Sequence, residues 1–309
     1  MTTALFTHSA CLAHDNGPSH PESPQRLRAV LSELGKADYA ALISFEAPQA
    51  TVEQIACVHD RAYIEEILTS VPRAGHVQLE PDTSLSPGSG EAALRAAGAV
   101  IAAVDEVMSG KIKNAFCAVR PPGHHAERAT VMGFCLFNNI AIGAAHALAV
   151  HGLKKIAIVD FDVHHGNGTD EWAKLYPETL FFSSHQFPLW PGSGRAEDRG
   201  PRGNIVNLPL APGTGSAEFR HVMESGVLPK LTQFRPEFIF ISAGFDAHKD
   251  DPLANLRLDE SDYEWITREL CKLATQSCQG RVVSSLEGGY DLAALAKSAG
   301  AHVKALMEA

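Results

Sequence analysis

Four short apolar segments of this chain are each followed directly by a cluster of polar residues, and no other feature restricts the fold as strongly. The segments are residues 115–119, 156–160, 238–242 and 281–286. Each is apolar enough to be buried on both faces, which is typical of the central strands of a parallel sheet. Longer segments with helical periodicity lie between them. The sequence therefore predicts an α/β fold in which one open parallel sheet carries helices on both faces.

The helical segments have the periodicity and the end signals of helices that pack on such a sheet. Ser23 and Pro24 predict a helix start, and apolar residues follow at the spacing of one helix face. Residues 91–108 are dominated by Ala, Leu and Val, and another apolar stripe begins at Tyr263, behind residues 259–262. Because no repeat, low-complexity tract or linker divides the sequence, we expect residues 1–309 to form a single domain.

Charge and hydropathy argue against two classes of partner. Twenty-six basic residues against 36 acidic ones give a net charge of −10, which repels a phosphate backbone, so we expect no nucleic-acid partner. No apolar run reaches the roughly 18 residues needed to span a bilayer, so we expect no membrane partner. The N-terminus lacks a signal-peptide pattern, and the six cysteines include no Cys-x-x-Cys pair. Both features predict a cytoplasmic protein with buried thiols.

The polar clusters behind the four strands are the candidate functional site. Ligands of open α/β sheets bind outside the carboxyl ends of the strands, so clusters at four strand ends predict one shared site. The clusters are Arg120 to His125, Phe161 to Gly168, Gly244 to Asp246, and Glu287 to Tyr290.

Two of these clusters contain residues suited to binding a metal ion. Asp162 and His164 are two positions apart, so in an extended chain their side chains point to the same face. Asp246 supplies a third ligand from another strand end. Three protein ligands with an open fourth position describe a catalytic zinc site, although this set also suits Fe(II) or Co(II). An isolated Asp-x-His is more often a helix cap beside a surface histidine, and the residues at the other strand ends favour the metal.

A histidine pair follows a rigid turn at the end of a third strand. His124 and His125 come after Pro-Pro-Gly, where adjacent side chains can both face a cavity and serve as one base and one auxiliary group. Asp160 is a candidate partner for one ring and Asn167 for the other. A carboxylate makes an imidazole more basic, whereas an amide orients it without adding charge.

Aromatic residues complete the predicted site. Tyr290 follows two glycines after the last strand, where its phenol can donate a hydrogen bond to a developing oxyanion. Gly133 and Phe134 are expected to line an entrance tunnel for the substrate, with Trp190 on the opposite wall. Residues 138–139 are expected to cap the helix that follows.

The ordered set of motifs resembles the histone deacetylase superfamily, and its class II branch in particular. The similarity extends over essentially the whole chain. Its motifs are His20 to Leu27, Val58 to Tyr63, Arg120 to His125, Gly133 to Cys135, Asp160 to Thr169, Ser242 to His248, and Glu287 to Tyr290. Asn167 stands where the class I pattern has an Asp, and Tyr290 stands where some nearly inactive class II relatives have a histidine. The resemblance implies an arginase/deacetylase-like fold and an active deacetylase.

The resemblance also implies a role for each site residue. The implied roles are zinc binding by Asp162, His164 and Asp246, general base catalysis by His125 with His124 as its electrostatic partner, orientation of His124 by Asp160 and of His125 by Asn167, and polarisation of the acyl carbonyl by Tyr290. A structural potassium ion is implied at Asp160, Asp162 and Ser183, together with the backbone carbonyls of His164 and Ser184.

Substrates of this family are acylated amines, either acetyl-lysine on proteins or acetylpolyamines. Polyamine-selective relatives have an acidic residue just after an Asp-Pro pair, whereas this chain has the apolar Leu253 after Asp251 and Pro252. It also lacks the inserted dimerisation loop of bacterial polyamine relatives. We therefore expect a zinc-dependent amidohydrolase that removes acetyl or other short acyl groups from acyl-lysine. Acetylpolyamine hydrolysis is the alternative, and the net negative charge favours it.

Two other functions are weaker alternatives. A binuclear manganese ureohydrolase of the arginase type needs a second Asp two residues after the late-strand Asp, where this chain has His248. A deacetylase fold that only binds acyl-amides is disfavoured, because no residue of the catalytic set is missing.

Overall fold

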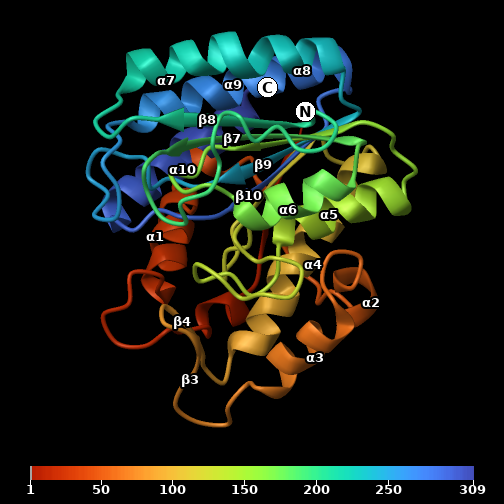
Figure 1. Cartoon of the computed structure of the whole chain (residues 1–309). Helices are drawn as coiled ribbons and strands as arrows, with labels where there is room; N and C mark the ends of the chain where they lie inside the picture. Colours follow the sequence, from red (N-terminus) through yellow and green to blue (C-terminus); the bar gives the residue numbers. More distant parts are fainter. Residues whose placement is uncertain (1) are drawn as a thin grey trace.

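A sheet of eight parallel strands runs through the centre of the computed structural model, which describes residues 2–309 (Figure 1). Its strands are Thr3–Thr7 (β1), Ile43–Glu46 (β2), Asn114–Cys117 (β5), Ile156–Asp160 (β6), Thr179–Gln186 (β7), Ile205–Leu210 (β8), Phe238–Ala243 (β9) and Val282–Leu286 (β10). The order across the sheet is β2-β1-β5-β10-β9-β6-β7-β8, and every neighbouring pair is parallel. The predicted α/β fold is confirmed.

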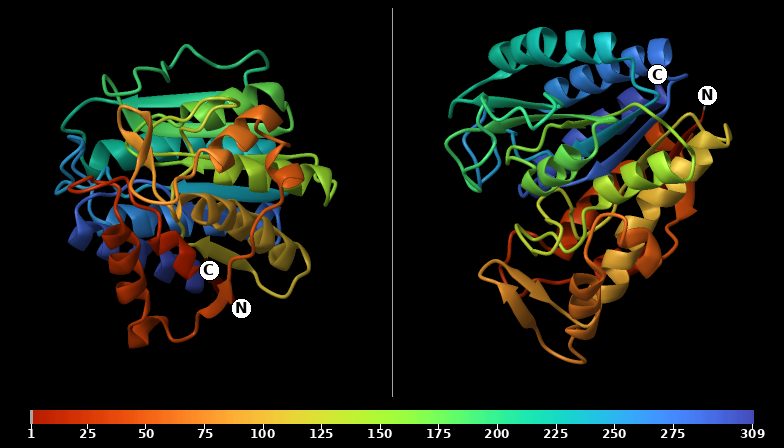
Figure 2. Two further views of the ribbon diagram at one scale, coloured as in Figure 1. Left: turned by 90° about the horizontal axis from the view of Figure 1, so that it is seen from below. Right: turned by 45° about the vertical axis from the view of Figure 1, so that its right-hand side comes forward.

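Helices cover both faces of the sheet (Figures 1 and 2). One layer consists of Ser89–Met108 (α4), Asn139–Ala149 (α5) and Asn167–Leu175 (α6). The other consists of Pro24–Leu34 (α1), Glu260–Ser277 (α9) and Leu292–Met307 (α10), with Ser216–Val222 (α7) and Leu228–Phe234 (α8) packed against α9. A π-helical turn, Met223–Val227, joins α7 to α8.

The predicted helix starts agree with the structure to within two residues. Helix α1 begins at Pro24, although the Ser23 side chain makes no capping hydrogen bond. Helix α4 begins at Ser89 rather than at residue 91. The side chains of Asn138 and Asp259 cap α5 and α9.

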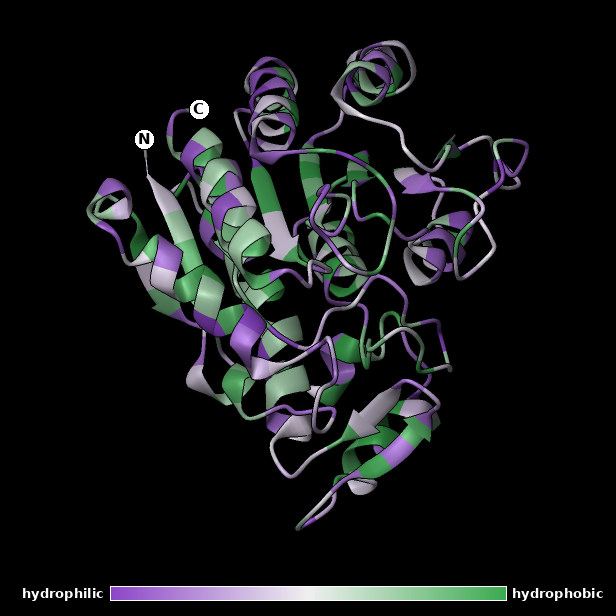
Figure 3. Cartoon of the chain, turned by 90° about the vertical axis from the view of Figure 1, so that its left-hand side faces the viewer, coloured by the Kyte–Doolittle hydropathy of each residue, from purple (hydrophilic) through white to green (hydrophobic). Residues whose placement is uncertain are grey.

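Hydrophobic residues of the strands and helices form one large buried cluster between the sheet and its helices. Figure 3 shows hydrophobic residues along the strands of the sheet. Every residue of β6, β9 and β10 is buried, as expected for strands that are covered on both faces. A second, smaller hydrophobic cluster lies between α4 and the short helices Val52–Ile55 (α2) and Arg61–Thr69 (α3). Beside these helices lies the antiparallel hairpin of Val77–Glu80 (β3) and Thr83–Leu85 (β4).

The four strands predicted from the sequence are neighbours in the middle of the sheet, in the order β5-β10-β9-β6. Their ends differ from the predicted ones by at most two residues. Because the strands are parallel, their carboxyl ends lie at one edge, and the four polar clusters meet there.

The cysteines are all free thiols, and five of the six are buried. The prediction of buried thiols is wrong for Cys57, which is exposed because it lies in a surface turn directly after the short helix α2. Within residues 2–309, no helix combines the length and apolar character that a bilayer crossing requires.

Candidate active site

Asp162, His164 and Asp246 come together at the carboxyl edge of the sheet. Asp162 and His164 follow β6, and Asp246 follows the neighbouring strand β9. Nδ1 of His164 lies 3.2 Å from Asp162 Oδ1 and 3.1 Å from Asp246 Oδ2. One ligand atom from each residue lies within 4.8 Å of the other two. Both carboxylates are buried and the imidazole is largely buried.

The chemistry of these three side chains fits a divalent metal ion. Burial, together with the charge of Asp162, raises the pKa of Asp246 to about 7, because two carboxylates shielded from water repel each other. Although burial lowers the pKa of His164, the hydrogen bonds and charges of both carboxylates raise it to about 10. The group therefore attracts positive charge. Two carboxylate oxygens and one imidazole nitrogen are ligands of a catalytic zinc site with one position open.

The backbone after β10 closes around these carboxylates. The Gly288 N–H donates to Asp162 Oδ2 at 2.8 Å. A Cβ atom at Gly288 would lie 2.2 Å from Asp246 Oδ2 and 2.6 Å from Asp162 Oδ2. Only glycine lets the backbone approach the two side chains this closely.

The rings of His124 and His125 lie side by side, with centroids 3.9 Å apart, and each contacts a different partner. Nδ1 of His124 lies 2.9 Å from Asp160 Oδ2, at the end of β6. Nδ1 of His125 lies 2.8 Å from Asn167 Oδ1, at the start of α6. Oε2 of Glu287 accepts the His124 N–H at 3.2 Å and so anchors the turn that carries both rings.

The surroundings of Asn167 determine which nitrogen of His125 carries the proton. Nδ2 of Asn167 lies 2.7 Å from Glu127 Oε1, and an ionised carboxylate can only accept, so the amide oxygen must face His125. The neutral His125 ring therefore carries its proton on Nδ1. Its Nε2 is left free to accept a proton.

The environment moves the pKa values of the two histidines in opposite directions. Burial lowers the pKa of His125 well below its usual value, and the charges of His124 and His164 lower it further. Burial also acts to lower the pKa of His124, but the charges of Asp160 and Asp162 outweigh it and raise that pKa well above its usual value. The pair therefore consists of a neutral imidazole beside an imidazolium, as in sites that separate acid and base roles.

Tyr290 is positioned through its backbone by Asp251, which the sequence analysis used only as a marker for the position of Leu253. Its N–H donates to Asp251 Oδ2 at 2.7 Å, and the other oxygen of Asp251 accepts the N–H of the exposed Leu253 at 3.0 Å. The guanidinium carbon of Arg26 lies 4.9 Å from the centre of the Tyr290 ring. Burial raises the pKa of the Tyr290 phenol well above its usual value, so the hydroxyl stays protonated and can donate a hydrogen bond.

Phe134 and Trp190 lie against different members of the site. The rings of Trp190 and His125 are nearly perpendicular, with centroids 4.7 Å apart. Phe134 lies 5.9 Å from the Tyr290 ring and 4.8 Å from the His20 ring. Trp190 is 42% exposed, which places it at the rim of the site.

Gly133 lies where a side chain cannot be accommodated, and Gly133→Ala is expected to lower kcat/KM. Its φ is +53°, and a Cβ atom would lie 2.5 Å from His125 Cδ2 and 2.6 Å from Trp190 Cη2. The added methyl group must displace both rings, and a misplacement of about 1 Å can cost about 10²-fold in rate. Steady-state kinetics on the purified variant measures the loss.

The matched control is Gly152→Ala. Gly152 has a similar φ of +68°, but a Cβ atom at this position would have no neighbour within 4 Å, so the backbone strain is comparable and the steric clash is removed. We expect this variant to keep its activity. An equal loss of kcat/KM in both variants would contradict the packing argument.

The residues expected to bind a second cation lie next to the first group. Asp160 and Ser183 are register partners in β6 and β7. His185 Nε2 lies 2.9 Å from the Gly194 carbonyl oxygen, so Nε2 donates and Nδ1 must accept. Ser183 Oγ, 2.9 Å from that Nδ1, therefore donates its proton and keeps its lone pairs free. The expected ligand at Ser184 is its backbone carbonyl, because the side chains of adjacent strand residues point to opposite faces and its hydroxyl lies away from that of Ser183. Such oxygens fit a hard cation.

A buried ion network behind Tyr290 was missed by the sequence analysis. Both oxygens of Glu22 contact the Arg120 guanidinium, one of them at 2.6 Å, and Glu22 Oε1 lies 3.1 Å from Arg26 Nη1. All three side chains are buried. Arg26 also donates to the Gly289 carbonyl at 2.6 Å, directly before Tyr290. The sequence offered one signal for this network, since Arg26 lies beside the apolar stripe of α1 and is buried there. It offered none for the pairing of Glu22 with Arg120, because these residues are 98 positions apart.

His248 contributes nothing to the carboxylate group. Its nitrogens lie 3.7 Å from Asp250 and 3.7 Å from Glu260, neither of which belongs to that group. In the part of the chain that the structure describes, the His/Cys/Asp/Glu group at this edge consists of Asp162, His164 and Asp246.

Comparisons with known proteins agree on one family. The sequence profile described as histone deacetylase domain matches residues 20–306. The histone deacetylase-like amidohydrolase of Pseudomonas aeruginosa is 38% identical over 93% of this chain and 81% of its own length. Histone deacetylase 14, chloroplastic, of Arabidopsis thaliana is 39% identical over 98% of this chain and 76% of its own length. The crystal structure of the HDA15 HD domain superimposes with a TM-score of 0.94 at 35% identity, covering 99% of this chain and 88% of that one.

Proposed function

This chain belongs to the histone deacetylase family, and on that basis we propose that it is a zinc-dependent amidohydrolase that removes acetyl or other short acyl groups from acyl-lysine side chains. The products are a carboxylate and a free amine. The observation that carries the proposal is the convergence of a three-ligand group and a hydrogen-bonded histidine pair at one edge of the sheet.

In this proposal Asp162, His164 and Asp246 hold the metal. When bound, zinc lowers the pKa of a water ligand from about 15.7 to about 7 and polarises the amide carbonyl. The same side chains suit Fe(II) or Co(II), and the metal content and activity of protein reconstituted with each ion distinguish the three.

The histidine pair performs the proton transfers. His125 accepts a proton at Nε2, because Asn167 holds the ring with its proton on Nδ1. His124, paired with the Asp160 carboxylate, stabilises negative charge that develops beside it. A histidine of the pair then protonates the departing amine.

Tyr290 donates a hydrogen bond to the oxyanion in this mechanism, and Tyr290→Phe is expected to lower kcat by about 10²–10³-fold. The change removes one hydroxyl and leaves the Asp251 contact, which uses the backbone N–H, in place. Zinc content and thermal stability should match the parent. Tyr176→Phe serves as control, since its hydroxyl makes only a long contact of 3.5 Å with Cys57 O. Turnover within a few-fold of the parent would remove Tyr290 from the mechanism.

The apolar Leu253 supports acyl-lysine over polyamines as the substrate class. Leu253 is exposed and uncharged at the position after the Asp251-Pro252 pair, where polyamine-selective relatives have an acidic residue. A panel of acetyl-lysine peptides, longer acyl-lysine peptides and acetylputrescine, assayed on the zinc-loaded protein, tests this assignment. A higher kcat/KM for acetylputrescine would favour the acetylpolyamine alternative.

We also propose a structural potassium ion held by Asp160, Asp162 and Ser183 together with the backbone carbonyls of His164 and Ser184, and the free lone pairs of the Ser183 hydroxyl support it. We further propose that residues 1–309 form a single catalytic domain, since one sheet takes strands from residues 3 to 286.

The two weaker alternatives give different results in the same assays. Release of urea from guanidino substrates would favour a ureohydrolase, which the position of His248 does not support. Binding of acetyl-lysine peptides without turnover would favour a silent binding module. Hydrolysis that a hydroxamate chelator inhibits would exclude both.

A further inference from the structure

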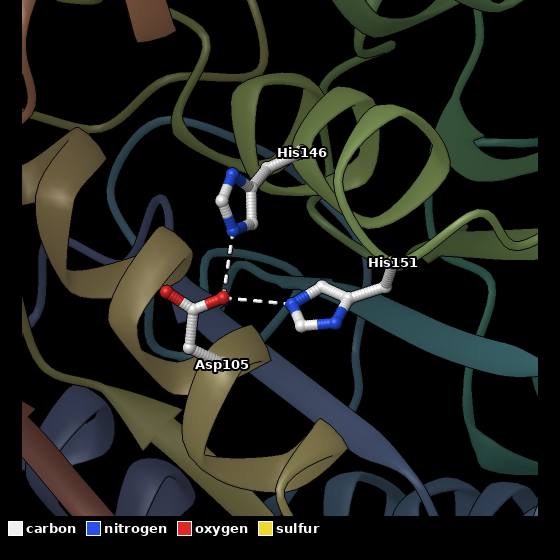
Figure 4. Close-up of side chains that lie close together, drawn as sticks. All are labelled: Asp105, His146 and His151. Carbon is white, nitrogen blue, oxygen red and sulfur yellow. Dashed lines mark hydrogen bonds and ion pairs between the residues drawn. The ribbon is translucent and has the colours of Figure 1, made fainter.

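Asp105, His146 and His151 form a second group of potential metal ligands, apart from the site described above (Figure 4). Asp105 lies near the end of α4, His146 lies in the last turn of α5, and His151 follows the C-cap of α5. Helix α5 starts beside the site at the carboxyl edge and ends just before β6 begins. The group therefore lies at the amino edge of the sheet, opposite the catalytic residues.

The two imidazoles point the same nitrogen at one carboxylate oxygen. Nε2 of His146 and Nε2 of His151 each lie 2.7 Å from Asp105 Oδ1. The rings are inclined at 74°, with centroids 5.5 Å apart. Zinc bonds of about 2.0–2.2 Å in a tetrahedral arrangement hold ligand atoms about 3.3 Å apart. The distance from Asp105 Oδ1 to each Nε2 therefore needs to increase by only about half an ångström.

Close helix packing holds the backbone that carries Asp105 and His146. Helices α4 and α5 approach so closely that a Cβ atom at Gly143 would lie 2.3 Å from Val100 Cγ1. Asp105 and His146 follow these two contact residues by about one turn on their respective helices. Because helix packing already fixes the distance between Asp105 and His146, binding an ion would cost little conformational entropy at these two residues.

Charge and accessibility also suit a cation. The Asp105 side chain is 49% exposed, whereas those of His146 and His151 are 11% and 22% exposed. An ion from solvent can therefore reach the group at the exposed carboxylate, while the two imidazoles are mostly shielded from water. Asp105 supplies the one carboxylate of the group, and its negative charge favours a cation.

We propose that Asp105, His146 and His151 bind a divalent transition metal ion of the zinc type, in a site that ties the C-terminal ends of α4 and α5 together. Two imidazole nitrogens and one carboxylate oxygen are zinc ligands, and the same set binds Cu²⁺ more tightly in the general order of divalent ions. The site is independent of the catalytic one and of the function proposed for it.

Metal counting and copper spectroscopy test the proposal. Protein equilibrated with micromolar free zinc should contain one zinc ion more than the double variant His146→Gln/His151→Gln. Zinc-loaded parent protein titrated with one equivalent of Cu²⁺ should show an electron paramagnetic resonance signal with nitrogen coupling from two imidazoles. The double variant should lose that signal, and Asp105→Asn should weaken copper binding at least tenfold.

The matched control is the double variant His76→Gln/His221→Gln, which removes two exposed histidines elsewhere on the surface. It should keep both the zinc count and the copper signal. Deacetylase activity and circular dichroism verify that each variant is folded. Equal zinc counts in parent and His146→Gln/His151→Gln, or a copper signal that survives in this variant, would overturn the proposal.

Discussion

His125→Ala is expected to lower kcat by about 10²–10⁴-fold, the range typical of losing a general base. The variant should keep its zinc, because His125 is not among the residues of the carboxylate group. We expect kcat to fall because the variant lacks Nε2 of His125, the atom that accepts the proton in the proposed mechanism. Initial rates on an acetyl-lysine peptide, with zinc analysis of the same samples, measure the effect.

Asn167→Ala tests how much of the effect of His125 depends on the orientation of its ring. This change leaves the imidazole of His125 in place but removes the acceptor 2.8 Å from Nδ1, so the proton can move to either nitrogen. We expect a smaller loss of kcat than in His125→Ala. His76→Ala, at an exposed position, is the control and should match the parent. If His125→Ala kept its turnover to within a few-fold, another group would have to be the base.

Glu22→Ala is expected to lower the free energy of unfolding by about 3–5 kcal/mol, the usual result of removing one partner of a buried ion pair. The change leaves the Arg120 guanidinium without its carboxylate and takes one acceptor from Arg26. Urea unfolding followed by circular dichroism measures the difference. Because Arg26 also bonds the Gly289 carbonyl, the Tyr290 loop should loosen and kcat should fall as well.

The control is Glu264→Gln, which breaks an ion pair with Arg268 on the surface. These side chains are 37% and 43% exposed, and exposed pairs contribute about 0.2–1 kcal/mol. A loss of stability in Glu22→Ala no larger than in Glu264→Gln would show that the buried network does not hold this part of the fold.

The effect of Glu22 should depend on pH. Burial acts to raise the pKa of Glu22, but the charge of Arg120 and the hydrogen bonds from His14 and Arg120 hold it well below its usual value. Because the pKa of Glu22 is lower in the folded state, its ionised carboxylate contributes its full stabilisation above the unfolded-state pKa of about 4.3. This contribution is lost as the pH falls toward the folded-state pKa. The stability difference between parent and variant should therefore be constant near neutral pH and shrink below about pH 4.

Strands β5, β6, β9 and β10 were predictable because each is a continuous apolar segment, and such segments are buried in the middle of a parallel sheet. Strand β7 was missed although all of its residues are buried, because its second half reads Ser-Ser-His-Gln. Tertiary partners satisfy the last two of them: His185 Nε2 donates to Gly194 O, and Gln186 Oε1 accepts the Asn255 N–H. Local pattern carries no information about such partners.

The sequence by itself determined which residues gather at the carboxyl edge, since parallel strands end at one edge whatever their order in the sheet. Only the tertiary structure decided the contacts within that edge: Asp251 beneath Tyr290, and Glu22 against Arg120. It alone also brought Asp105 to His146 and His151, 41 and 46 positions away. Backbone periodicity follows from neighbours a few residues apart, whereas each of these contacts depends on how whole helices and loops pack.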